Sequence, residues 1–168
     1  TYKPRDEIGL LKRYSDITQV DMSKGNWLVL SSANYFLDDA KDLCEIQGWY
    51  YQYKGMNSVS LKLLLALNNW ESWRKGEWLN HLEIKNIYQY LGSNVAVGYQ
   101  KGKTLHSDAK YTLKECQEQH GLKTSNVWYE SFEGLDPMTE TYIRNMRANG
   151  EMINKNPRII MSTIHAAK

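Results

Sequence analysis

This chain of 168 residues has little cysteine, no long apolar run and no strong charge imbalance. Its two cysteines, Cys44 and Cys116, cannot build a disulfide framework and have no metal-ligand partners at a suitable spacing. No apolar run approaches the ~20 residues of a membrane span, and no signal peptide is visible. We therefore expect two buried or half-buried thiols, no metal site, no membrane partner and a reducing, cytoplasmic location.

The motifs of an independent enzyme are missing as well. The pair Gly102–Lys103 does not belong to a G-x-x-x-x-G-K-[ST] phosphate-binding loop. Neither an H-E-x-x-H zinc motif, nor a pair of catalytic carboxylates, nor a nucleophile elbow occurs. We therefore expect no catalytic residue in this chain and no ATP hydrolysis by it alone. The net charge of +2 is too small to indicate nucleic-acid binding by itself.

Aromatic residues are plentiful, with 12 Tyr and 6 Trp against 2 Phe. Tyrosine and tryptophan suit partly exposed surfaces that stack or hydrogen-bond, and they equally line a wet core. Trp70, Trp73 and Trp78 lie beside Arg74 and Lys75. The spacing of three between Trp70 and Trp73 favours a core role. The alternative is an exposed surface for a nucleic acid or a protein partner.

A strand, a helix and a second strand are predicted in succession after residue 26. Residues 27–30 are apolar without alternation, which is typical of a central strand covered on both faces. The apolar residues that follow have near-helical spacing up to Gly48: Phe36, Ala40, Leu43, Cys44 and Ile46. Residues 49–53 are aromatic and strand-like. Short connections between these elements predict a βαβ unit with a right-handed crossover.

Helical patterns dominate residues 58–150. They predict helices from Ser58 or Ser60 to Arg74, from Leu79 to Leu91, from Ser107 to Gly121 and from Asp136 to Ala148. Asp136–Pro137 is a strong start, because proline suits the first helical position. A further short helix is predicted from Asp6 to Tyr14. The interior of the chain is therefore expected to be mainly helical.

An apolar run resumes near the end of the chain. Ile159, Ile160 and Met161 follow Pro157, and this β-branched run predicts a buried strand. The polar cluster from Ser162 to Lys168 follows at its carboxyl end, where ligands bind in open α/β sheets. Its hydroxyl, imidazole and ammonium groups suit phosphate oxygens. The alternative is a solvated strand end without a ligand.

Two segments resemble motifs of the UvrD/Rep-type superfamily-one DNA helicases. Thr163-Ile-His-Ala-Ala-Lys168 resembles the first part of motif V, T-x-H-x-x-K-G-x-E. Residues 27–37, a helical stretch and Gly48-Trp-Tyr-Tyr-Gln-Tyr-Lys-Gly55 resemble the motif IV strand, its helix and the following G-x-x-Y-x-x-x-G strand. The order of the segments is the family's, in which a helical insertion, the 2B subdomain, separates them. Because the sequence stops inside motif V, we expect a piece of a longer polypeptide.

The resemblance implies a fold and a division of the chain. We expect an α/β, predominantly helical protein with a partial parallel RecA-like sheet, of the P-loop NTPase type, and an inserted helical subdomain. Residues 1–57 would form the first part of the second RecA-like motor domain, residues 58–156 the insertion, and residues 157–168 the return strand and the start of motif V. The parent would unwind DNA with ATP and Mg²⁺, in the cytoplasm of a bacterium or within the life cycle of a phage.

The resemblance also implies partners and site residues. Thr163 and His165 would lie near single-stranded DNA, and Lys168 in the loop that joins the DNA site to the nucleotide cleft. ATP would bind against the first RecA-like domain of the parent, and none is expected on this piece alone. Ser32 takes the place of the family's motif IV arginine, and Asn34 is a further candidate for the cleft. Serine cannot supply a guanidinium charge, so another residue supplies it or the motor is unusual.

A second class of function stays open. The chain could be a non-enzymatic helical interaction module of a DNA replication or repair complex. Its partner surface would then be the cluster of Trp70, Trp73 and Trp78. The two hypotheses differ in which part of the chain carries the contact, because the helicase hypothesis relies on the strand ends and the module hypothesis on the insertion.

Overall fold

The computed structural model describes residues 10–151 and 156–165. Within these ranges the chain is an α/β protein with six α-helices and a small mixed sheet. The strands are β1 (Trp27–Ser31), β2 (Tyr51–Tyr53), β3 (Met56–Asn57), β4 (Leu79–Asn80), β5 (Lys110–Tyr111) and β6 (Ile159–Thr163). The helices are α1 (Tyr35–Gln47), α2 (Leu61–Arg74), α3 (His81–Tyr88), α4 (Leu113–Gln119), α5 (Trp128–Ser131) and α6 (Pro137–Ala148), with 3₁₀ turns η1 (Ile17–Gln19) and η2 (Gly92–Asn94).

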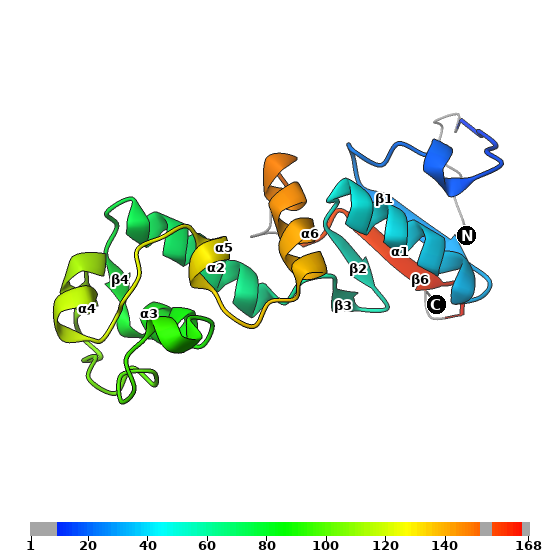
Figure 1. Cartoon of the computed structure of the whole chain (residues 1–168). Coiled ribbons are helices and arrows are strands. Elements are labelled where there is room, and N and C mark those ends of the chain that lie inside the picture. The colour runs from blue at the N-terminus through cyan, green and yellow to red at the C-terminus, as the bar shows by residue number, and fades with distance from the viewer. Residues whose placement is uncertain (1–9, 152–155, 166–168) are drawn as a thin grey trace.

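The main sheet brings the two ends of the described chain together. Its strand order is β1-β6-β2-β3, and β6 runs parallel to both of its neighbours. Ile160 pairs with Leu28 on one side and with Gln52 on the other. The predicted parallel pairing of the three segments is therefore confirmed, and α2 to α5 lie outside this sheet (Figure 1).

The antiparallel strand β3 was not predicted, and it makes the sheet mixed. Lys54 and Gly55 join β2 to β3, and both have positive φ, 50° and 81°. Two successive residues of positive φ form the tight hairpin turn whose twist suits adjoining strands. Glycine in the second position makes this turn accessible at low cost.

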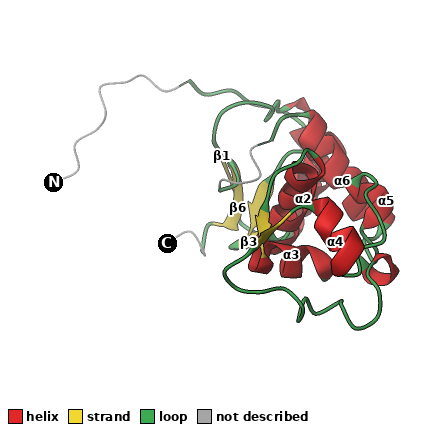
Figure 2. Ribbon diagram, turned by 90° about the vertical axis from the view of Figure 1, so that its left-hand side faces the viewer, coloured by secondary structure: helices red, strands yellow, loops and turns green. Residues whose placement is uncertain are grey.

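β1 lies at an edge of the sheet, and only one sheet face is covered by the described helices. α1 packs on that face, and α6 packs beside α1 (Figure 1). Figure 2 shows β1 and β6 at one side of the helices. On the other face Leu28 is 61% exposed, and its register partner Ile160 is also exposed. The prediction of a central strand covered on both faces was therefore wrong, because an apolar run does not reveal a strand's position in a sheet.

Helix α1 ends where the sequence indicated, and the middle of its predicted apolar face is buried. Gly48 adopts the left-handed conformation (φ 68°) and closes the helix. Ala40, Leu43 and Cys44 are buried as predicted, but Phe36 and Ile46 at the two ends of this face are exposed, and Leu37 is buried in place of Phe36. At Gly48 an added Cβ would lie 2.5 Å from the Asn145 Cβ of α6, so glycine also permits the close approach of the two helices.

The part of the predicted insertion from α2 to α5 contains a two-stranded sheet, and its buried side chains belong to the same hydrophobic core as those of the main sheet and α1. The small sheet pairs Leu79 of β4 with Tyr111 of β5. Residues 110–111 are therefore a strand, and the helix predicted from Ser107 begins only at Leu113, with Thr112 as its N-cap. Likewise α3 begins at His81, because β4 occupies the first residues of the predicted helix.

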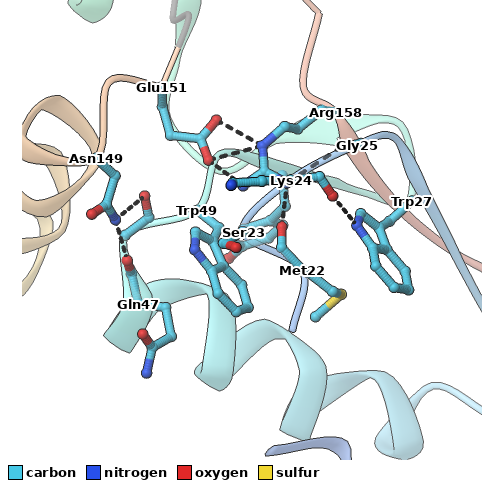
Figure 3. A network of polar contacts seen from close by, with 12 residues as sticks. Met22, Ser23, Lys24, Gly25, Trp27, Gln47, Trp49, Asn149, Glu151 and Arg158 are labelled. Atoms are coloured by element: carbon cyan, nitrogen blue, oxygen red, sulfur yellow. Dashed lines mark hydrogen bonds and ion pairs between the residues drawn. The ribbon is translucent and has the colours of Figure 1, made fainter. Parts of the chain in front are cut away.

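The segment before β1 differs from its prediction. Residues 10–14 are not helical, and the rest of the helix predicted from Asp6 lies outside the described residues. Arg158 anchors the later part of this segment to the return strand (Figure 3). Its guanidinium forms an ion pair with Glu151 (Nη2 to Oε1, 2.5 Å) and donates to the carbonyl of Met22. The backbone N–H of Trp27 donates to the Arg158 carbonyl at 2.7 Å, so Arg158 is bound to the start of β1 as well as to Met22 and Glu151.

Candidate functional site at the carboxyl ends of the strands

The carboxyl ends of three parallel strands meet at one edge of the main sheet. The Ile164 N–H donates to the Ser31 carbonyl at 2.9 Å, just beyond β1 and β6. The Lys54 N–H donates to the Met161 carbonyl at 3.1 Å, which ties the end of β2 to β6. Residues 31–34, 53–55 and 163–165 are thereby brought together. This edge is where open α/β sheets bind their ligands.

The segment that resembles motif V leaves the sheet at this edge. Thr163 is half-buried and pairs in register with Ser31. His165 follows in a turn and is exposed, so its imidazole is accessible to a ligand. Lys168 lies outside the described residues. The described part of the motif therefore offers one hydroxyl and one imidazole beside the end of β1.

The two residues proposed for a nucleotide cleft lie on the neighbouring connection from β1 to α1. Ser32 and Asn34 are both exposed. Asn34 is the N-cap residue of α1, and its side chain makes no capping hydrogen bond. A free hydroxyl and a free amide can each donate to a phosphate oxygen. The structure therefore brings both residues to the same edge as Thr163 and His165.

An exposed aromatic pair at this edge was missed in the sequence. Tyr35 and Phe36 open α1, are 64% and 55% exposed, and have ring centroids 4.1 Å apart. Near the end of β2, the Lys54 ammonium lies 4.9 Å from the centre of the Tyr53 ring. The signal in the sequence was two aromatic residues directly after a polar turn, but the helical spacing of Phe36 suggested a core role. Exposed rings of this kind offer stacking surfaces for bases.

The charges around this edge are divided. Asp38 and Asp39 are exposed on α1 just after the aromatic pair. Their carboxylates repel phosphate groups, whereas Lys54 attracts them. Ser32 provides no positive charge where the family has its arginine, so these residues do not fit the stabilisation of a phosphoryl-transfer transition state. The edge suits bases and phosphate oxygens, and we derive no step of ATP hydrolysis from it.

The tryptophan cluster is divided between core and surface. Trp70 and Trp73 are 0% and 1% exposed, and their indole N–H groups each donate at 3.0 Å, to the carbonyls of Asn126 and Tyr111. Trp78, in contrast, is 58% exposed. The core role that the spacing favoured for Trp70 and Trp73 is therefore confirmed, and these buried, hydrogen-bonded rings cannot contact a partner. Of the three tryptophans, Trp78 remains a candidate for a partner surface.

Other reactive groups in the described part of the chain are buried or scattered. Burial raises the pKa of both Cys44 and Cys116 to about 12, which keeps them as unreactive thiols. Among residues 10–151 and 156–165, no three His, Cys, Asp or Glu side chains cluster closely enough to hold a metal ion. No helix in those same ranges has the length and apolar character needed to cross a membrane.

Comparisons of the whole chain with protein-family profiles, curated proteins and solved structures find no match.

Proposed function

We propose that this chain is part of an ATP-dependent DNA helicase or translocase of the UvrD/Rep type. It would contain the front of the second RecA-like domain and its helical insertion, with the divisions near residues 57 and 157. The observation that carries this proposal is the position of β6 between β1 and β2. A strand that returns after a long helical excursion and pairs in parallel with the first βαβ unit is the arrangement that the two resembling segments require.

In this proposal the carboxyl edge of the sheet contacts single-stranded DNA. Thr163 and His165 hydrogen-bond to phosphate oxygens, which positions a strand without reading its sequence. The rings of Tyr35 and Phe36 stack on bases, and the backbone is kept on the β6 side by repulsion from Asp38. ATP and Mg²⁺ would bind between this unit and the first RecA-like domain of the parent. Cleft closure there would move the strand across this edge.

The test is binding of this chain to a fluorescent oligothymidine, measured by anisotropy at low salt. We expect weak binding that falls with added salt, because phosphate contacts release counterions. His165→Ala should weaken binding several-fold, to a similar degree for thymidine and mixed-sequence oligonucleotides. His106→Ala is the matched control, since His106 is an exposed histidine of the insertion. Absence of binding, or an equal loss in both variants, would contradict the proposal.

A protein-interaction module is the second candidate, and one observation favours it. Trp78, directly before β4, and Leu82, in the first turn of α3, are both exposed. Exposed tryptophan is enriched among the residues that anchor protein interfaces. If oligonucleotide binding fails while Trp78→Ala abolishes capture of a replication or repair protein, this second function replaces the first.

A further inference from the structure

A groove lies between α1 and α6, away from the carboxyl edge of the sheet. Its volume is about 880 Å³, and residues of both helices line it together with Ser58. Ile46 and Met138 contribute exposed apolar side chains to its wall, one from each helix. Exposed apolar side chains that line a shared groove are typical of a site that another molecule or segment covers.

The charges of this groove are all of one sign. Asp42, Glu45 and Asp136 line it, and none of the lining residues is a lysine or an arginine. The Asp136 carboxylate accepts the Thr139 N–H at 2.9 Å as the cap of α6, and this hydrogen bonding lowers its pKa. The Glu45 carboxylate accepts a hydrogen bond from the Tyr51 hydroxyl at 2.7 Å. The Lys41 ammonium, 3.7 Å from the same carboxylate, neutralises part of its charge. The groove therefore repels nucleic acid and favours a cationic, partly apolar occupant.

The chain itself carries a segment with that chemistry. Leu10 and Leu11 are 82% and 81% exposed, and Tyr14 is exposed as well. Lys12 and Arg13 lie between them and add two positive charges. The segment is not helical. These five consecutive residues thus combine exposed apolar side chains with two cations. The segment complements the groove in its apolar character and in its charge.

We propose that the groove binds the Leu10–Tyr14 segment of a second copy of this chain. The leucine side chains cover Ile46 and Met138, and the two cations approach Asp42 and Asp136. Because the segment and the groove are different surfaces, the contact is heterologous. Two reciprocal contacts would close a dimer, and unreciprocated contacts would build a head-to-tail chain. This contact is independent of the proposed action on DNA.

The experiment is sedimentation velocity of the whole chain over a range of concentrations. We expect reversible self-association that weakens with salt, because charge pairs contribute to it. Arg13→Asp and Asp42→Arg should each weaken association about tenfold or more, which corresponds to about 1.4 kcal/mol. Mixing the two variants should restore it, since the reversed charges then face each other. Glu118→Arg, an equal charge change on the exposed surface of α4, should leave it intact.

A peptide covering residues 10–14, titrated into ¹⁵N-labelled protein, locates the contact independently of variant folding. The amide signals of Ile46 and Met138 should shift, and an excess of peptide should dissociate the associated protein. A chain that stays monomeric at every concentration would overturn the proposal. So would association unaffected by Asp42→Arg, or peptide shifts centred on the exposed sheet residues Leu28 and Ile160 instead of the groove.

Discussion

The two parts of this molecule bury their apolar side chains to different degrees. In the part of the predicted insertion from α2 to α5, Trp70, Ile84 and Ile87 are completely buried, and α2 packs against both α3 and α5. In the sheet unit, made of the main sheet with α1 and with α6, the last helix of the predicted insertion, Leu28 and Ile160 form an apolar pair that no described helix covers. The part from α2 to α5 therefore encloses these large apolar side chains, whereas the main sheet is covered on one face only. Both proposed contact sites lie on the sheet unit.

The largest expected effect comes from truncating the core of the insertion. Trp70→Ala should lower the free energy of unfolding by ~3–5 kcal/mol, because it removes a buried ring and its hydrogen bond to Asn126. Trp78→Ala, the matched control just beyond the end of α2, should change it by about 0.5 kcal/mol or less, because the ring is exposed. Urea denaturation measures both values. Similar losses for the two variants would mean that the core of the insertion has been assigned wrongly.

The next effect compares the two faces of the main sheet. Ile159→Thr should lower the free energy of unfolding by about 2–4 kcal/mol, because a hydroxyl replaces an ethyl group in the buried layer between the sheet and α1. Ile160→Thr changes the adjacent residue in the same way and should cost about 1 kcal/mol or less, since its side chain is exposed. Both substitutions keep a β-branched residue in β6. Thermal unfolding of these two variants tests whether one face of the main sheet is exposed to solvent. Equal losses of stability in the two variants would indicate that both faces of the sheet are covered.

The smallest expected effect is a pH dependence in the insertion. Burial, and then the charge of His106, lowers the pKa of His120 below its ordinary value of 6.5. Below pH 6.5 the unfolded chain therefore binds more protons at this site than the folded chain does. This stabilisation is present above pH 6.5 and is lost as the pH falls toward the lowered folded value. His120→Gln should flatten the decline in stability below pH 6.5, and urea denaturation at a series of pH values measures it. Parallel pH profiles of the wild type and His120→Gln would contradict this account.

The elements of this protein were largely encoded by local signals in the sequence. Asp136 accepts the Thr139 N–H and Pro137 opens α6, as a capping residue followed by proline predicts. Gly48 ends α1 for an equally local reason, because a left-handed residue costs glycine least. The apolar runs before Ser31 and after Pro157 predicted strands, and their parallel pairing followed from the interrupted βαβ pattern. These signals act within a few residues, so the sequence alone determined them.

Which side chains became core, edge or site was decided only by the tertiary structure. The sequence does not reveal that β6 lies between β1 and β2 in the sheet. This strand order leaves β1 at the edge of the sheet, with Leu28 exposed. Residues 110–111 look helical until Leu79 pairs with Tyr111. Phe36 has the spacing of a core residue, but it lies beside Tyr35 on the surface of α1. Whether a side chain is buried depends on which distant segments of the chain pack against it. Helix caps, turns and apolar periodicity are local signals and do not identify those segments.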